Sequence, residues 1–326
     1  VTNCTITSNT VTGDGGGIYC INSNLRISGC AIGLSGSANT ATNGGGIYCY
    51  SSNSRITNST IVGNSVSWWG GGIYCNGSSP LIADCQINEN SASDCGGGIY
   101  LVTGSNATIS NCTIAGANSA TYYGGGIYCE TSSPVISGCT IGGALGGNNA
   151  GDSGGGICLF SSTPSKIVNC VITNNSALNV GGGIELWNNC SPPVINCLIA
   201  NNSATAVSAG DGNGGGIDCY GNSNPTMSDC TIADNTATND GGGMSCYVSA
   251  PVLNNSILWG NIADSDTSGA GLGNQIYTWR SAGTPCTVTL NYSDYADNTV
   301  DPNNIAGTGT VTANNCIVSD PVFVGG

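Results

Sequence analysis

Gly70-Gly71-Gly72-Ile73-Tyr74-Cys75 is the stretch that decides the fold, because close copies of it recur along the chain. Nine Gly triplets begin at residues 15, 44, 70, 96, 124, 154, 181, 214 and 241, and eight of them are followed by Ile. They are 26 to 33 residues apart, and a period of this length is typical of a solenoid that adds one coil per repeat. We therefore predict one elongated repeat domain for the 326 residues.

A single coil, residues 70–96, predicts three short strands separated by bends. Ile73–Cys75 is the first strand, and the Gly and Pro residues of 76–80 form the turn after it. Leu81–Ala83 and Cys85–Ile87 are the second and third strands. If each strand pairs with its copy one coil away, the chain is an all-β, single parallel β-helix (a β-solenoid). We expect about 11–12 coils of about 27 residues, right-handed by analogy with known parallel β-helices.

The regular part of this solenoid is expected over residues 1–250, and irregular coils over residues 251–326. The division rests on the Gly triplet, which decays to Gly269-Ala270-Gly271 in the last part of the chain.

Alignment of the coils produces columns, in which equivalent residues stack about 4.8 Å apart. The Ile of the first strand and the Ile of the third strand form two inward ladders that we assign to the core. Two polar columns mark bends, where stacked amides can bond one another and the bend backbone. The first comprises Asn58, Asp84, Asn111, Asn169, Asn196, Asp229 and Asn255, and the second Asn9, Asn64, Asn90, Asn175, Asn202, Asn235 and Asn261.

Most of the nineteen cysteines fall in two columns, one after the Gly triplets and one before the Ile of the third strand. If disulfides joined the two columns within each coil, a coil that lacks the first cysteine should also lack the second. The coil with Leu101 at the first position nevertheless keeps Cys112 at the second. Since an inward Cys behaves as a small hydrophobic residue, we interpret both columns as core. Four cysteines lie off the columns and are the better disulfide candidates: Cys95, Cys158, Cys190 and Cys286. The count is odd, so at least one thiol is unpaired within the chain.

Charge and composition exclude several classes of partner. The net charge is −14 with only four basic residues, so neither nucleic acid nor an anionic membrane surface is an expected partner. No apolar run approaches the length that spans a bilayer, and membrane insertion is not expected. The chain contains no histidine, which removes the commonest metal ligand and general base. It begins Val1-Thr2-Asn3-Cys4, which suggests a mature or excised part of a precursor.

Three segments, each before a Gly triplet, have the pattern Ile-x-x-Asn-Ser/Thr: Ile87–Ala92, Ile172–Ala177 and Ile232–Ala237. This pattern resembles the FxxN and GGAI repeats of polymorphic outer membrane proteins, with Ile in place of Phe and Gly in place of the central Ala. The segments Asn255–Asn261 and Asp320–Val324 resemble the end of large secreted bacterial β-helix repeat proteins. The resemblance implies a secreted or surface-attached Gram-negative protein. The superfamily mixes adhesins, surface-layer components and polysaccharide-active enzymes, so the resemblance assigns no catalytic residue.

An outward column of tyrosines is the main candidate binding surface. It comprises Tyr19, Tyr48, Tyr74, Tyr100 and Tyr128, with Trp68, Trp69, Tyr122 and Tyr123 in the loops before two of the same strands. Aromatic faces at regular spacing suit sugar rings or a partner protein. The alternative is that these loops fold over the tyrosines as a small second core.

The same column continues with Glu185 and Asp218 on neighbouring coils. Their carboxyls are expected about 5 Å apart, a spacing that suits retaining glycosidases. The alternative is a solvated pair of acids on an acidic protein. Calcium is a further alternative, because aspartates precede several Gly triplets in loops: Asp14, Asp94, Asp152, Asp211 and Asp240. Their spacing matches no established calcium loop, so we predict no metal or other cofactor.

The leading functional hypothesis from sequence is a non-enzymatic extracellular or cell-surface scaffold or adhesin, because uniform repetition shows no cluster of unlike reactive side chains. The runner-up is a polysaccharide lyase or glycoside hydrolase that uses Glu185 and Asp218. Expected partners are glycans, a surface protein, or further copies of the chain stacked end to end in a filament or longer fibre, since the open ends of a β-helix present unpaired backbone groups.

Overall fold

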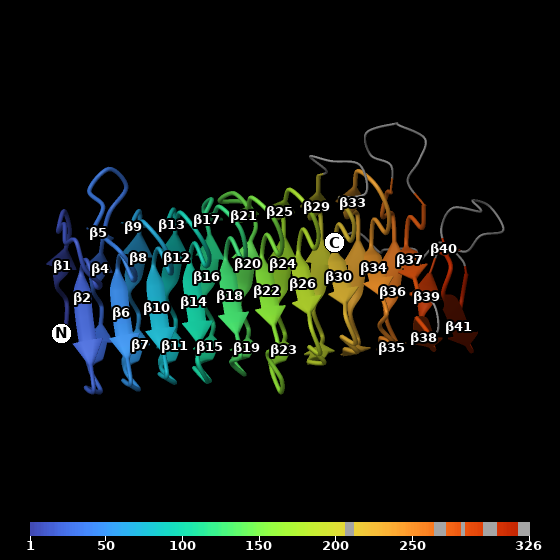
Figure 1. Cartoon of the computed structure of the whole chain (residues 1–326), viewed down its shortest axis with the longest axis horizontal. Coiled ribbons are helices and arrows are strands. Elements are labelled where there is room, and N and C mark those ends of the chain that lie inside the picture. The colour runs from blue at the N-terminus through green and yellow to red at the C-terminus, as the bar shows by residue number, and fades with distance from the viewer. Residues whose placement is uncertain (206–211, 264–271, 282–283, 296–304, 319–326) are drawn as a thin grey trace, which may run out of the picture.

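The computed structural model describes residues 1–205, 212–263, 272–281, 284–295 and 305–318. These residues form 41 short strands and no helix, so the prediction of an all-β chain is confirmed. Every pairing between the strands is parallel, and each strand pairs with its counterparts in adjacent coils. The strands stack side by side along the long axis of the molecule (Figure 1). The chain is therefore a single parallel β-solenoid of about eleven coils.

Four sheets run along this axis, and we number them in the order in which a coil passes through them. The first sheet follows the Gly triplets and comprises β2 (Ile18–Ile21), β6 (Ile47–Tyr50), β10 (Ile73–Asn76), β14 (Ile99–Val102), β18 (Ile127–Glu130), β22 (Ile157–Phe160), β26 (Ile184–Trp187), β30 (Ile217–Tyr220), β34 (Met244–Tyr247), β37 (Ile276–Trp279) and β40 (Ile305–Gly307). The second sheet comprises β3 (Arg26–Ser28), β7 (Arg55–Thr57), β11 (Leu81–Ala83), β15 (Thr108–Ser110), β19 (Val135–Ser137), β23 (Lys166–Val168), β27 (Pro193–Ile195), β31 (Thr226–Ser228), β35 (Val252–Asn254), β38 (Thr287–Asn291) and β41 (Thr310–Asn314). The third sheet comprises β1 (Thr5–Ile6), β4 (Ala31–Ile32), β8 (Thr60–Val62), β12 (Gln86–Asn88), β16 (Thr113–Ala115), β20 (Thr140–Gly142), β24 (Val171–Thr173), β28 (Leu198–Ala200), β32 (Thr231–Ala233), β36 (Ile257–Trp259) and β39 (Asp294–Tyr295). The fourth sheet comprises β5 (Thr40–Ala41), β9 (Ser65–Val66), β13 (Ser91–Ala92), β17 (Ser119–Ala120), β21 (Asn149–Ala150), β25 (Ser176–Ala177), β29 (Ser203–Ala204) and β33 (Thr236–Ala237).

The Gly triplets are required because backbone from two other segments passes close to them. Gly70 has a positive φ of 68°, a conformation that only Gly adopts without strain. A Cβ on Gly71 would lie 2.6 Å from the carbonyl oxygen of Gly97 and 2.7 Å from the backbone of Ser91. The triplet therefore brings the start of the first strand against both the next coil and the fourth sheet.

The fourth sheet is absent from the sequence prediction, which gives three strands per coil. Its strands have two residues each, too few to show an alternating pattern. In β13, Ser91 is partly exposed while Ala92 is buried and packs against its copies in adjacent coils. The sheet follows directly after the second polar column, which turns the chain into it.

That second column is a continuous asparagine ladder inside the protein. Each Nδ2 donates to the Oδ1 of the next coil's asparagine at 2.8–3.0 Å, through Asn9, Asn39, Asn64, Asn90, Asn118, Asn148, Asn175, Asn202, Asn235 and Asn261. Asn90 also donates to the Ile61 carbonyl at 2.9 Å, so the ladder satisfies backbone groups that the bend leaves buried. This confirms the predicted role of the column and adds Asn39, Asn118 and Asn148 to it.

The first polar column lies at the bend between the second and third sheets. Its seven residues all have positive φ, between 48° and 56°, which Asn and Asp tolerate better than other residues with a Cβ. Asn196 donates to Asn169 at 2.9 Å, and Asn111 donates to Asp84 at 3.3 Å. The predicted stacking is confirmed, and the unusual backbone conformation explains why Asn and Asp fill the column.

The core of the solenoid contains the two predicted Ile ladders and both cysteine columns in one buried cluster, except that Cys4 is exposed and that Ile6 and Cys316 are only partly buried. All nineteen cysteines are free thiols, and seventeen of them are buried. The disulfide candidates Cys95, Cys158, Cys190 and Cys286 were therefore wrongly assigned. Cys190 explains why: it replaces a buried serine in a ladder at the end of the first sheet, and its backbone N–H bonds Ser223 Oγ at 3.1 Å.

Strands β35 to β41 continue the first three sheets beyond residue 250, whereas the last strand of the fourth sheet in the described part of the chain is β33. The division at residue 250 stays a prediction, and the decayed triplet at 269–271 lies outside the described residues. In the part of the chain that is described, no helical segment has the length and hydropathy of a transmembrane helix.

Candidate functional site

The tyrosine column occupies the second position of the first-sheet strands and forms a stack. Neighbouring ring centroids are 5.0 to 5.4 Å apart from Tyr19 to Tyr128. Trp69 stacks on Tyr74 at 6.3 Å, and Tyr123 stacks on Tyr128 at 5.8 Å.

These loop residues cover the stack, so the predicted exposed strip is largely absent. Four of the predicted binding tyrosines are buried: Tyr48, Tyr74, Tyr100 and Tyr128. Only Tyr19, at the first coil, remains exposed, together with Trp68 and Tyr122 in the loops. The alternative of a small second core is what the structure contains, because large rings on adjacent coils bury more apolar surface against the loops than they leave to solvent.

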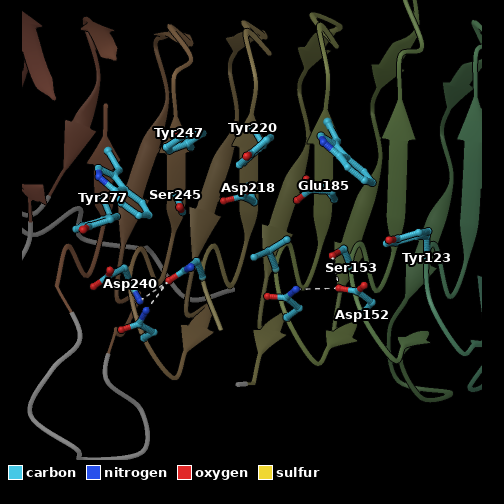
Figure 2. A pocket seen from close by; sticks show the side chains of 16 residues that line it. Tyr123, Asp152, Ser153, Glu185, Asp218, Tyr220, Asp240, Ser245, Tyr247 and Tyr277 are labelled. Carbon is cyan, nitrogen blue, oxygen red and sulfur yellow. Dashed lines mark hydrogen bonds between the residues drawn. The ribbon is translucent and has the colours of Figure 1, made fainter. Parts of the chain in front are cut away.

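A cleft begins where this column changes its residue type. After Tyr128 the second position is held by Cys158, Glu185, Asp218 and Ser245, until Tyr277 restores a ring. The smaller side chains leave room above the first sheet, and a cleft of about 660 Å³ lies there. Tyr123 and Tyr277 lie toward its two ends, with Glu185, Asp218 and Ser245 between them (Figure 2).

Aromatic side chains from the fourth position of the same strands form one wall of the cleft. They are Trp187, Tyr220, Tyr247 and Trp279. Tyr220 stacks on Tyr247 with ring centroids 4.7 Å apart, and Tyr247 meets Trp279 edge-on at 5.3 Å. None of these four residues is among the binding residues predicted from the sequence. The signal that could have found them is an aromatic residue that recurs at the end of the first-sheet strand, where its side chain points to the same side as the second position.

Polar residues that precede the Gly triplets form the opposite wall. Asp152 accepts a hydrogen bond from Asn179 Nδ2 at 2.9 Å, and the backbone N–H of Asp240 donates to Asn213 Oδ1 at 3.0 Å. Asp240 Oδ1 also accepts from the Leu272 N–H at 2.8 Å. Burial raises the pKa of Asp240. This wall is thus a row of amides and carboxyls that faces the row of aromatic rings.

Glu185 and Asp218 lie side by side on the floor, as the sequence predicts. They are directly paired in the register of β26 and β30, which places their backbones about 4.8 Å apart. The two residues are only 2% and 4% exposed, so the alternative of a solvated acid pair is wrong. Among the described residues, Glu185 Oε2 has no hydrogen-bond partner.

The environment shifts the pKa values of the Glu185 and Asp218 carboxyls by different amounts. Burial, followed by the negative charge of Asp218, raises the pKa of Glu185 well above its ordinary value. Burial also raises the pKa of Asp218, but interactions with Ser245 and Glu185 lower it, leaving it at about 7. A pair of this kind holds one proton on Glu185 while Asp218 carries the charge, which is the arrangement that acid–base catalysis by two carboxyls needs.

The aspartates considered for calcium do not come together. Asp14 accepts from Asn43 at 2.8 Å and Asp94 accepts from Cys95 Sγ at 2.8 Å, in coils other than those of Asp152 and Asp240. Asp211 lies outside the described residues. Within the described ranges, no group of three or more His, Cys, Asp or Glu side chains is placed to hold a metal ion.

Comparison with known families agrees with this architecture. A family model described as the right-handed β-helix region matches residues 1–147 and 124–292. The chain belongs to the right-handed β-helix family. Membership of this family confirms the expected handedness, whereas the narrower resemblance to polymorphic outer membrane protein repeats stays a prediction.

Comparisons with individual proteins give only distant matches. Curated proteins give no significant match. The solved structure of the periplasmic alginate epimerase AlgG has a TM-score of 0.43 and 11% identity, over 88% of this chain and 76% of the epimerase chain. A double mutant of the same epimerase gives 0.42 and 12%, over 96% and 84%. A TibC-hyperglycosylated TibA fragment gives 0.19 and 14%, over 95% and 97%.

Proposed function

We propose that the cleft binds a glycan chain and that Glu185 and Asp218 cleave a glycosidic bond in it. The observation that carries the proposal is the buried pair of carboxyls with separated acidities on the floor of an aromatic-walled cleft. Trp187 and Tyr220 offer ring faces to sugar rings, while the amides and carboxyls of the opposite wall offer partners to hydroxyl groups. Adjacent coils repeat this arrangement along the axis, so an extended chain fits better than a single sugar.

The proposed reaction is hydrolysis with two carboxyls in different roles. Glu185, held protonated by burial, donates its proton to the glycosidic oxygen as the bond from that oxygen to the anomeric carbon breaks. The Asp218 carboxylate attacks the anomeric carbon and forms a glycosyl ester. Glu185 then removes a proton from water, which attacks the ester and releases Asp218. Retaining enzymes separate their carboxyls by about 5–5.5 Å, and adjacent strands of the first sheet supply a similar spacing.

This proposal replaces the scaffold or adhesin as the leading hypothesis. A purely structural coil gains nothing from a buried carboxyl oxygen without a partner, since burial of an unpaired polar group costs stability. In earlier coils the equivalent position holds a buried tyrosine, which packs in a small second core and leaves no carboxyl oxygen unpaired. Because polysaccharides of this kind lie outside the cytoplasm, we also propose that the protein is exported.

The scaffold remains the second candidate, favoured by the unbroken asparagine ladder from Asn9 to Asn261, which stiffens the solenoid. End-to-end stacking of copies belongs to this candidate. Rods longer than one chain in electron micrographs of the purified protein would support it, and monodisperse single-chain rods over a wide concentration range would exclude it.

The decisive experiment measures new reducing ends from a panel of plant, algal and bacterial polysaccharides. We expect turnover by the parent chain and a loss of about 10²- to 10⁴-fold in the Glu185→Gln and Asp218→Asn variants. Asp84→Asn is the matched control, because Asn58 and Asn111 already hold the equivalent exposed bend. Turnover that survives both cleft substitutions, or the absence of both binding and turnover on every polymer, would refute the proposal.

A further inference from the structure

We infer that the glycan taken by the cleft carries amino groups, so that its sugars are cationic rather than uronate or neutral. The inference rests on the proposed function and specifies its substrate class. It follows from the charges that line the cleft, from one buried carboxyl oxygen without a partner, and from the aromatic wall opposite the acids.

Among the described residues, four carboxyls line the cleft, and no basic side chain does. The acids are Asp152, Glu185, Asp218 and Asp240. Three of the chain's four basic residues, Arg26, Arg55 and Lys166, lie on strands of the second sheet, and Arg280 is exposed beyond the end of β37. The cleft therefore has a negative potential that the protein itself does not balance, on a chain whose net charge is already −14.

One carboxyl oxygen on the floor of the cleft has no hydrogen-bond donor, and a ligand can supply one. Glu185 Oε2 is buried and, among the described residues, accepts no hydrogen bond. Protein structures rarely leave such an oxygen unpaired unless a ligand or water completes it. An ammonium group carries up to three N–H donors and a positive charge. It can therefore donate a hydrogen bond to Glu185 Oε2 and at the same time offset the negative charge of Asp218.

The two walls discriminate between glycan classes. A uronate would place another carboxylate among four acids with no arginine or lysine to bind it, which is unfavourable. A neutral sugar can stack on Trp187 and Tyr220 but leaves the negative potential unbalanced. An amino sugar stacks on the same rings, and its ammonium group gains a further cation–π attraction from them.

Isothermal titration calorimetry with oligosaccharides of one length tests this directly. The probes are a β-1,4-linked glucosamine hexamer, the N-acetylglucosamine hexamer with the same backbone and no charge, and a galacturonate hexamer. Near neutral pH, where part of the amines is protonated and part of Asp218 is ionised, we expect the glucosamine hexamer to bind at least about tenfold more tightly than the acetylated one. The preference should shrink as salt is added, because salt screens charge pairs at a partly open cleft. The galacturonate hexamer should not bind.

Variants separate charge recognition from folding. Asp240→Asn and Asp152→Asn introduce the residue that Asn213 and Asn179 already provide in the same wall, so the fold should be kept. Each should reduce the ratio of the two affinities, that for the glucosamine hexamer over that for the acetylated hexamer, several-fold. Asp84→Asn, on the exposed bend, should change neither affinity.

The outcomes distinguish this inference from the function on which it rests. Equal or tighter binding of the acetylated or galacturonate hexamer, with turnover of that polymer, overturns the amino-sugar inference and leaves the cleavage proposal standing. A preference for glucosamine that the two cleft variants do not reduce also overturns it, because the charge would then be recognised elsewhere. Absence of binding and turnover for every class of glycan overturns both.

Discussion

Replacing both floor carboxyls, as Glu185→Gln with Asp218→Asn, should raise the free energy of unfolding at neutral and alkaline pH and remove part of its pH dependence. Burial raises the pKa of Asp218 from 3.8 to about 7 in the folded chain. The folded state therefore holds a proton that the unfolded state releases, and stability from this group is complete below about pH 4 and falls as pH rises to about 7. At 1.36 kcal/mol per pKa unit, the loss is about 4 kcal/mol for Asp218. The raised pKa of Glu185 adds to it in the same direction.

The assay is urea unfolding between about pH 4 and about pH 8, followed by far-ultraviolet circular dichroism. The difference in unfolding free energy between the double variant and the parent should grow with pH by about 4 kcal/mol or more. Asp84→Asn removes one exposed carboxyl and should follow the parent at every pH. A difference that stays constant with pH, or that shrinks as pH rises, would show that the pair is not held protonated by burial and would remove the basis for its separated roles.

Three further predictions concern the fold. Asn90→Ala removes the side chain that bonds Asn64, Asn118 and the Ile61 carbonyl, and should cost roughly 3 kcal/mol or more in urea unfolding. Asn169→Asp on the exposed bend keeps the oxygen that accepts from Asn196 and should stay within about 0.5 kcal/mol; equal effects would contradict the ladder's role. Gly71→Ala places a Cβ 2.6 Å from the Gly97 oxygen and should abolish cooperative unfolding or solubility, while Gly13→Ala, which meets nothing within 4 Å, should be neutral. A thiol reagent should label Cys4 rapidly in the native protein and the seventeen buried cysteines only in denaturant, and a reducing agent should leave the melting temperature unchanged; a drop on reduction would indicate disulfides.

Much of the fold follows from the sequence because a solenoid repeats its constraints. The Ile ladders, the cysteine columns and both polar bends recur in register. Each of the nine copies of the motif therefore gives the same indication of which positions are buried and which lie at bends. The fourth sheet escaped prediction because strands such as Ser91–Ala92 have too few residues to establish a period. The disulfide candidates were misassigned because a cysteine that stands in for another buried residue, as Cys190 does for serine, departs from the columns without needing a partner.

The site was predicted only in part, for a different reason. Register alone brings Glu185 and Asp218 together, and a register is visible in sequence. Whether an outward side chain is buried depends on the loop that folds over it, and this is why Tyr74 and Tyr100 lie beneath Trp69 rather than in solvent. The loops differ in length and sequence from coil to coil, so the repeat does not predict which outward side chains they cover.

The interruption of the tyrosine column means that the location of the cleft along the axis is set by side chains and not by the backbone. The strands beneath it pair in the same register as those of every other coil in the first sheet. Exchanging acids into positions 74 and 100, with a smaller residue at Trp69, should therefore move the floor four coils, or about 19 Å, without a new backbone hydrogen bond. A solenoid of this kind can thus acquire, lose or shift a reactive centre by a few point substitutions, and several such centres can be spaced at chosen intervals on one rod.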